Sequence, residues 1–190
     1  MAKKVVVLVG SLREGSYARK IAQNAIDMFS DDYDAEIVEI RDLPLYDADY
    51  DDAEMTNKPL PESYVSFRQA ISDAAGVLFV TPENNRTIPA CLKNAVDVAS
   101  KPKGAVAWTN TPAAIISHSV GAMGGYSANK NLRLALSYFV MPTIQQPEVF
   151  LGHSADLLDE NGKFKQESTI NFVQSYIDQF EDLMAKNPKA

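Results

Sequence analysis

The stretch that decides the fold of this chain is Lys4 to Tyr17, which reads KVVVLVGSLREGSY. Its apolar and β-branched run, Val5 to Val9, ends at Gly10 and leads through a polar turn into an amphipathic pattern. This order predicts a strand, a loop and the start of a helix. Because the first turn of a helix leaves N–H groups without partners and carries the positive end of the helix dipole, we expect the loop to hold an anion.

The side chains of this loop favour a phosphate. Ser11 and Ser16 add hydroxyl donors, and Arg13 adds a charged fork that suits phosphate. A nucleoside-triphosphate loop needs Lys and then Ser or Thr after its second glycine, but Ser and Tyr follow Gly15. A dinucleotide site needs glycine where Leu12 stands. The spacing therefore predicts a site for a single terminal phosphate, with an ordinary polar turn as the alternative.

Composition limits the class of protein. A chain of 190 residues with 46% hydrophobic content can bury one good core, so we expect a single domain over residues 1–190. The net charge of -7 disfavours nucleic-acid binding, which needs a basic face. The chain has one cysteine, Cys91, and lacks an apolar run of signal-peptide or membrane-spanning length. We therefore expect a cytoplasmic protein that does not contact a membrane.

A rhythm of strands and helices continues along the chain and predicts a parallel sheet whose crossovers are helices. Strands are expected at 5–9, 35–40, 77–80, 113–116 and 141–146. Helices are expected around 18–29, 62–75 (with Val65 among the buried positions), 92–99, 132–139 and 167–184. The pattern indicates an α/β fold.

Two later strand-to-helix loops are expected at the same edge of this sheet. One runs from Pro82 to Thr87, and the other begins at Ser117 and contains glycines at 121, 124 and 125. Ligands of such sheets bind where the strand order reverses, between the first and third strands. Amide groups suit a flat heterocycle, and glycines let the backbone approach it closely. We expect His118 to be a structural residue in this crevice, because no cysteine or carboxylate stands at metal or triad spacing; a functional role is the alternative.

The segment 42–62 is irregular and acidic, and is predicted to be a surface loop. Its aspartates match part of a calcium loop, but Asp52 and Lys58 stand where that loop needs Gly and Glu, so we expect no metal site. A solvated loop is one interpretation. A rim of the active site or a subunit contact, made with Tyr46 and Tyr50, is the other.

Four motifs together resemble the NADPH-dependent FMN reductase family, which includes chromate, quinone and azo reductases. The motifs are GSLREGSY at 10–17, DLPLYDAD at 42–49, TPENNRTIPACLKNAVD at 81–97 and HSVGAMGGYSANKNLRLAL at 118–136. The match covers nearly the whole chain. The resemblance implies a flavodoxin-like three-layer sandwich, with a five-stranded parallel sheet of strand order 2-1-3-4-5.

The resemblance also implies a bound FMN, with NADPH or NADH as co-substrate. It implies cofactor-binding roles for Ser11, Arg13, Ser16 and Tyr17 at the phosphate, for Pro82, Glu83, Asn84, Asn85 and Arg86 along the isoalloxazine ring, and for His118, Ser119 and Gly121 beside the ring. No side chain is expected to act as a catalytic acid or base, because the flavin carries the chemistry.

Three residues depart from the family's usual pattern. Asn84 stands where the family usually has a tyrosine that could stack on the ring. Ala90 replaces a glycine, and His118 replaces a small hydroxyl residue. These departures predict altered substrate preference and altered contacts at the polar edge of the ring.

The activity implied is a ping-pong transfer of hydride from NAD(P)H through FMN to quinones, azo compounds, free flavin or chromate-like acceptors. Arg13 and Arg86 are candidates to meet the extra phosphate of NADPH. The alternatives are a flavodoxin-type electron-transfer protein without a nicotinamide site, or a quinone-sensing binding module. A flavodoxin's phosphate loop lacks arginine, so Arg13 favours the reductase. The resemblance further implies a homodimer or homotetramer.

Overall fold

A sheet of five parallel strands forms the centre of the protein, in the order β2-β1-β3-β4-β5. This computed structural model describes residues 1–52, 54 and 57–189. The strands are β1 (Lys3–Val9), β2 (Tyr33–Ile37), β3 (Gly76–Pro82), β4 (Ala113–His118) and β5 (Val149–Leu151). The helices are α1 (Tyr17–Ile26), α2 (Glu62–Asp73), α3 (Ala90–Val98), α4 (Tyr126–Ser137), α5 (Ser154–Leu157) and α6 (Glu167–Lys186), with a 3-10 helix, η1 (Ala48–Asp51). The expected strand order is confirmed.

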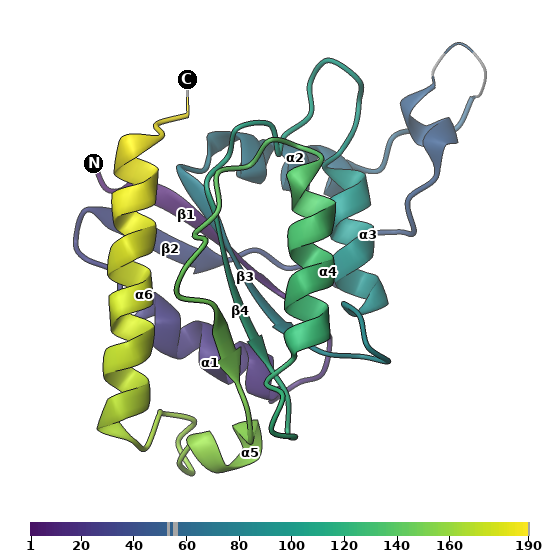
Figure 1. Ribbon diagram of the computed structural model, residues 1–190. Coiled ribbons are helices and arrows are strands. Elements are labelled where there is room, and N and C mark those ends of the chain that lie inside the picture. The colour runs from purple at the N-terminus through teal and green to yellow at the C-terminus, as the bar shows by residue number, and fades with distance from the viewer. Residues whose placement is uncertain (53, 55–56, 190) are drawn as a thin grey trace.

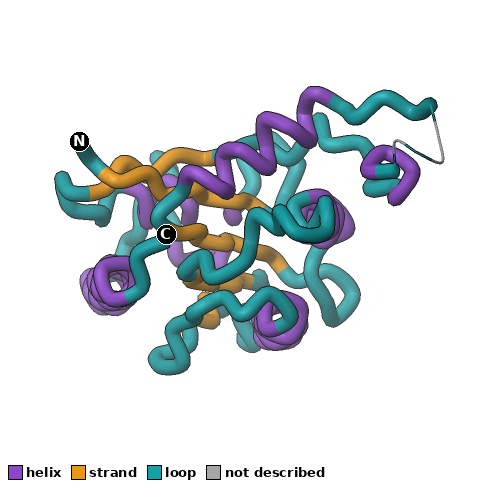
Figure 2. The backbone as a smooth tube through the Cα atoms, turned by 90° about the horizontal axis from the view of Figure 1, so that it is seen from above, coloured by secondary structure: helices purple, strands orange, loops and turns teal. Residues whose placement is uncertain are grey.

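Helices cover both faces of the sheet, so the fold has three layers (Figures 1 and 2). Helices α1 and α6 pack on one face, and α2, α3 and α4 pack on the other. Successive side chains of a strand point to opposite faces, and β1 shows this alternation clearly. Val5, Val7 and Val9 pack in the core beneath α1 and α6, whereas Val6 and Leu8 pack in the core beneath α2, α3 and α4. The unbroken apolar run that predicted this strand thus reflects burial on both sides.

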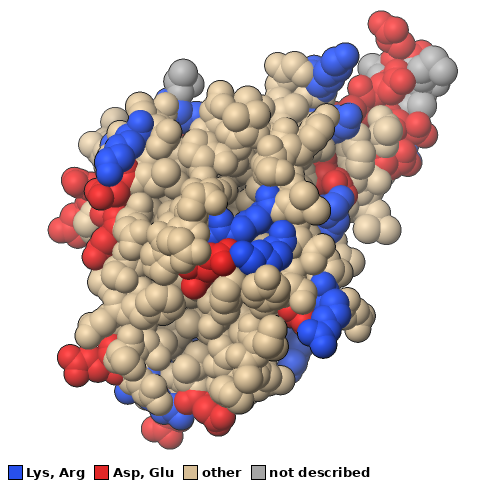
Figure 3. All heavy atoms as spheres, in the orientation of Figure 1, with Lys and Arg blue, Asp and Glu red and all other residues tan. Residues whose placement is uncertain are grey.

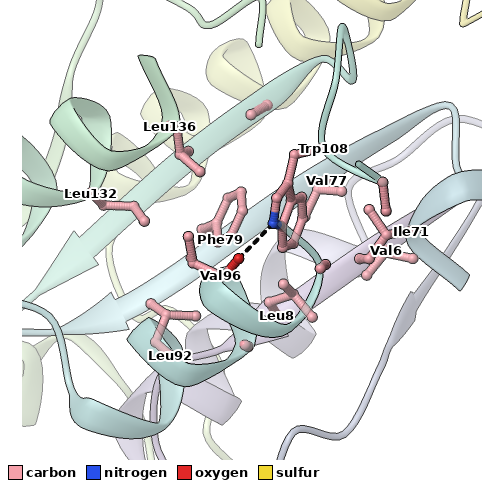
Figure 4. Packing of buried hydrophobic residues seen from close by; sticks show 14 of the residues in the cluster. Val6, Leu8, Ile71, Val77, Phe79, Leu92, Val96, Trp108, Leu132 and Leu136 are labelled. Carbon is pink, nitrogen blue, oxygen red and sulfur yellow. Dashed lines mark hydrogen bonds between the residues drawn. The ribbon is translucent and has the colours of Figure 1, made fainter. Parts of the chain in front are cut away.

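The connector between α3 and β4 contributes the centre of one core (Figure 4). Trp108 is fully buried there, and its indole Nε1–H donates to the carbonyl of Val96 at 2.8 Å. Its ring lies against Phe67 and Phe79. A buried indole needs such an acceptor, so the connector is fixed by both packing and a hydrogen bond.

The predicted fifth strand is wrong. Residues 141–146 contain only an isolated bridge between Thr143 and Ala113, and β5 forms at Val149–Leu151 instead. Pro142 and Pro147 lack the N–H group that a continuous ladder requires, so the chain leaves the sheet between them.

A side chain completes the sheet where this strand is interrupted. The hydroxyl of Tyr176, on α6, accepts from Ile115 N–H at 2.9 Å and donates to Ile115 C=O at 3.1 Å. Both backbone groups are buried and would otherwise lack partners. Tyr176 itself is fully buried, and burial raises the pKa of its hydroxyl to about 12.

Smaller boundary predictions also differ. The second strand is Tyr33–Ile37 rather than 35–40, and the first helix ends at Ile26. Val65 was expected to be buried but is 50% exposed, because Tyr64 and Phe67 carry the buried face of α2. The last helix extends through Lys186, close to its predicted end.

The acidic segment 42–61 is anchored to the body of the protein by polar side chains. Asn94 of α3 accepts from Tyr46 N–H at 2.7 Å and donates to Pro44 C=O at 2.9 Å. Arg68 of α2 forms a two-pronged contact with Asp51, with both distances 2.7 Å. Positions 53, 55 and 56 of the predicted loop lie outside the described residues. The described part is therefore held in place, not merely solvated.

The tyrosines of this segment pack inward. Tyr46 stacks on Tyr64, and Tyr50 meets the same ring edge-on. Apart from Asp51, which pairs with Arg68, acidic side chains gather on the part of the segment that projects from the body (Figure 3). No helix within the described ranges is long and apolar enough to cross a membrane.

We predict that Tyr176→Phe lowers the free energy of unfolding by about 1–3 kcal/mol, because it leaves the N–H and C=O of Ile115 buried without partners. The measurement is the urea midpoint at constant m-value. Tyr138→Phe is the control, since Tyr138 is 84% exposed and should tolerate loss of its hydroxyl. Equal midpoints for the two variants would contradict the role given to Tyr176.

Candidate functional site

A cavity of about 530 Å³ opens at the carboxyl ends of β1, β3 and β4. Figure 1 shows that β3 and β4 run in the same direction and end at the same edge of the sheet. In the sheet, β2 lies on one side of β1 and β3 on the other, so the strand order reverses between β1 and β3. Ligands of such sheets bind at this reversal. Residues of the loops after β1 and β3 line the cavity, together with His118 at the end of β4. The volume lies within the ~300–1,000 Å³ typical of ligand sites.

The first loop supplies one end of the cavity. Ser16 caps α1, because its Oγ accepts from Arg19 N–H at 3.2 Å. The preceding N–H groups, those of Tyr17 and Ala18, have no helical acceptor and stand at the positive end of α1. Arg13 is exposed and has no ion-pair partner in the described part of the chain. This end of the cavity is suited to an anion.

Two features fix the path of this loop. A Cβ on Gly10 would lie 2.9 Å from Thr81 Oγ1 and 3.2 Å from Leu92, so only glycine lets β1 end this close to β3. The guanidinium of Arg41 donates to the carbonyl of Leu12 and holds the middle of the loop. Both Gly10 and Leu12 line the cavity.

The second loop is a tight turn. Asn84 N–H donates to Thr87 C=O at 2.9 Å, and Thr87 N–H donates back at 3.0 Å. The two residues between them, Asn85 and Arg86, have φ values of 50° and 68°. Both positions are left-handed, and the turn carries the Arg86 side chain outward, where it is 79% exposed. Pro82 and Asn84 line the cavity, whereas Asn85 and Arg86 do not.

Glu83 has a structural task. Its Oε2 accepts from Ser127 N–H at 2.9 Å and Ala128 N–H at 3.3 Å, at the start of α4. Gly125 stands at the N-cap of α4 and has no side chain to cap the helix, so a carboxylate from another loop takes that role. Glu83 thereby ties the second loop to the third.

The third loop is compact, and only the residue that precedes it, His118 at the end of β4, lines the cavity. Ser119 Oγ donates to Gly121 C=O at 2.9 Å, and neither residue lines the cavity. A Cβ on Gly125 would lie 2.8 Å from the carbonyl of His118, so the loop folds back directly onto the end of β4. His118 alone reaches the cavity from here.

His118 is buried, with 5% of its surface exposed. Its Nδ1 lies 3.1 Å from Ser154 Oγ, and its Nε2 has no hydrogen-bond partner among the described residues. Burial lowers the pKa of the imidazole to about 4, so the ring is neutral at pH 7. The expected structural role accounts for Nδ1 and leaves Nε2 unexplained.

The structure thus gathers seven of the twelve predicted residues around one cavity. They are Ser11, Arg13, Ser16, Tyr17, Pro82, Asn84 and His118. The sequence did not identify Gly10, Leu12, Ala18, Pro89 and Cys91 as lining residues, and Ala90 was noted only as a departure from the family pattern. Pro89 and Ala90 open α3 and could have been found as a further helix start. Burial raises the pKa of the Cys91 thiol. Tyr46 and Tyr50 do not line this cavity.

Chemically, the cavity offers an anion site at one end and amide, proline and imidazole groups at the other. No carboxylate lines it among the described residues. The described residues also contain no cluster of three or more His, Cys, Asp or Glu side chains that could hold a metal ion. The arrangement can bind and orient an elongated ligand with a charged end.

Comparison with known proteins identifies the family. The profile of the NADPH-dependent FMN reductase family matches residues 3–156. A quinone reductase of Pseudomonas putida is 44% identical over 183 residues, covering 96% of this chain and 95% of its own. A 2-hydroxy-1,4-benzoquinone reductase of a Burkholderia species is 39% identical, covering 95% of each chain.

A solved structure agrees with these sequences. FerB, a flavoenzyme NAD(P)H:(acceptor) oxidoreductase from Paracoccus denitrificans, superposes with a TM-score of 0.88 at 31% identity. The alignment covers 98% of this chain and 100% of FerB. With most of its length matched by the family profile, this chain belongs to the NADPH-dependent FMN reductase family.

Proposed function

We propose that the protein is an NAD(P)H-dependent oxidoreductase that binds FMN in the cavity at the carboxyl edge of the sheet and reduces quinones. The observation that carries this proposal is the cavity itself, which joins an anion loop to a set of polar groups suited to a flat heterocycle. Membership of the family supports it.

The residues present fit FMN. Ser11, Arg13 and Ser16, with the first N–H groups of α1, would hold the phosphate. Pro82 and Asn84 would lie along the ring. The unpartnered Nε2 of His118 supports this assignment, because a buried nitrogen without a partner is costly unless a ligand supplies one.

When bound, FMN would supply the redox chemistry, since it can take hydride from a reduced nicotinamide and pass electrons to an acceptor. The chain's own residues would bind, orient and shield. The loop from Gly10 to Tyr17 fixes the charged end, and the tight turn at Asn84 walls one side. Because no carboxylate lines the cavity among the described residues, we assign no acid or base to a side chain.

The nature of the acceptor is the finer part of the proposal. The named activities of the Pseudomonas and Burkholderia relatives favour quinones. Azo compounds, free flavin and chromate-like ions are further candidate acceptors. Since one cavity would serve the nicotinamide and the acceptor in turn, we propose ping-pong kinetics. The small side chain of Asn84 leaves more room above the site than a tyrosine would.

We further propose a homodimer or homotetramer that works in the cytoplasm. Support comes from large apolar side chains at the exposed end of α4 and just beyond it: Leu134 is 74%, Tyr138 84% and Val140 72% exposed. Several large apolar side chains exposed near one helix end are typical of a contact surface. Light scattering on the protein as it elutes from a size-exclusion column measures its mass. The mass of a monomer would contradict the proposed assembly.

We expect anaerobic addition of NADPH or NADH to bleach the visible flavin absorbance of the FMN-loaded protein within the mixing time of a stopped-flow experiment. Subsequent addition of a benzoquinone should restore the band. A flavin that stays oxidised with both nicotinamides but is reduced by dithionite would instead indicate an electron carrier. A protein that cannot be loaded with FMN would defeat the proposal.

We expect Arg13→Gln to weaken FMN binding by about 10- to 100-fold, the loss of a charge-assisted contact to phosphate. Arg19→Gln is the matched control, because it removes the same charge from an α1 residue that pairs with Glu39 and does not line the cavity. Fluorescence quenching on titration of the apoprotein gives both dissociation constants. Equal affinities in the two variants would rule out the phosphate assignment.

A further inference from the structure

Among the described residues, the Nε2 atom of His118 is the one buried side-chain nitrogen or oxygen that lacks a hydrogen-bond partner. The ring lines the cavity, and its other nitrogen is engaged by Ser154. Buried polar atoms in native proteins are nearly always paired, so an exception at a cavity wall points to a missing ligand atom.

The contact with Ser154 determines which nitrogen carries the proton. Ser154 is fully buried, and His118 Nδ1 is the single acceptor within reach of its hydroxyl in the described structure. If Nδ1–H donated to Ser154, the serine O–H would have no acceptor and Nε2 would have no donor. If the serine donates to Nδ1, only the Nε2–H group is left over. The second arrangement leaves fewer unpaired groups, so Nε2 bears the hydrogen.

The surroundings keep the ring uncharged. Burial is the cause of the lowered pKa of His118, and no carboxylate lines the cavity among the described residues to favour the charged form. At neutral pH the side chain therefore presents one N–H donor and no charge. The geometry of imidazole directs this N–H away from Ser154.

The place of His118 in the sheet indicates which part of a ligand it faces. It ends β4 in register with Pro82 of β3, and β3 separates β4 from β1. Neighbouring strands are ~4.8 Å apart, so His118 stands about 10 Å across the sheet from the anion loop after β1. A ligand whose phosphate sits in that loop would present its ring, not its phosphate, to His118.

We propose that His118 Nε2–H donates a hydrogen bond to an acceptor atom on the ring of the bound flavin, and that Ser154 is a positioning residue that fixes the tautomer. This inference rests on the proposed function. The inference assigns a specific contact to His118, which stands where the family usually has a small hydroxyl residue. It also assigns a positioning role to Ser154 of α5.

The test is titration of the apoprotein with FMN and with riboflavin, which lacks the phosphate. We expect His118→Phe to weaken both by about tenfold, the effect of one lost neutral hydrogen bond. His118→Gln, which keeps an N–H donor, should restore most of the affinity. His153→Gln is the control, since His153 is exposed and does not line the cavity.

The outcomes separate this inference from the proposed function. Wild-type protein that binds neither flavin would overturn the proposed function. Flavin binding unchanged in His118→Phe would overturn the inference alone, as would a loss confined to FMN, because that pattern assigns the contact to the phosphate.

Nitrogen NMR of the imidazole provides a readout independent of turnover. We expect the Nε2–H tautomer in the wild type, a mixture of tautomers in Ser154→Ala, and a shift of the Nε2 signal when FMN is added. His153→Gln assigns the signals, since the chain has 2 histidines. An Nδ1–H tautomer in the wild type would refute the role given to Ser154.

Discussion

Burial of β1 on both faces is the constraint on which the rest of the structure depends. Five consecutive apolar side chains, Val5 to Val9, alternate between two hydrophobic cores, so both layers of helices must be present for this strand to be stable. A strand buried in this way carries polar groups mainly at or beyond its ends. The polar residues that follow Val9 are therefore concentrated at one edge of the sheet, and the same holds for β3 and β4. The cavity arises from this separation of apolar and polar sequence.

The three loops at that edge are not independent. Glu83 crosses from the second loop to cap α4, and Ser154 N–H donates to Ser119 C=O at 3.0 Å, which joins the third loop to α5. His118 is paired with Pro82 of β3 on one side and with Leu151 of β5 on the other. Residues that line the cavity, such as His118, are thus positioned by residues outside its lining, such as Ser154 and Glu83. Rigid walls of this kind suit a site whose task is to orient a ligand.

Local apolar periodicity and helix starts were sufficient to predict the first four strands and the three loops, including most of the first-loop residues that line the cavity. The strand order followed instead from the resemblance to the family. The position of β5 follows from Pro142 and Pro147, but the pairing of Ile115 with Tyr176 could not be predicted, because the two residues are distant in sequence. The sequence could not show that Asn84 lines the cavity whereas Arg86 does not. The turn that points Arg86 outward has left-handed residues at Asn85 and Arg86, and neither is a glycine that would have signalled it. The partnership of His118 with Ser154 depends on tertiary packing and has no signal in either motif.

The interrupted ladder beside β4 also affects the tendency of the protein to aggregate at high concentration. An exposed sheet edge offers free N–H and C=O groups to any passing strand, and long flat edges promote aggregation. At one edge β5 is only 3 residues long, and Tyr176 already occupies the groups of Ile115. At the other edge, β2 carries the outward charges of Asp34 and Glu36. Both edges of the sheet thus carry features that disfavour the addition of a strand from another molecule.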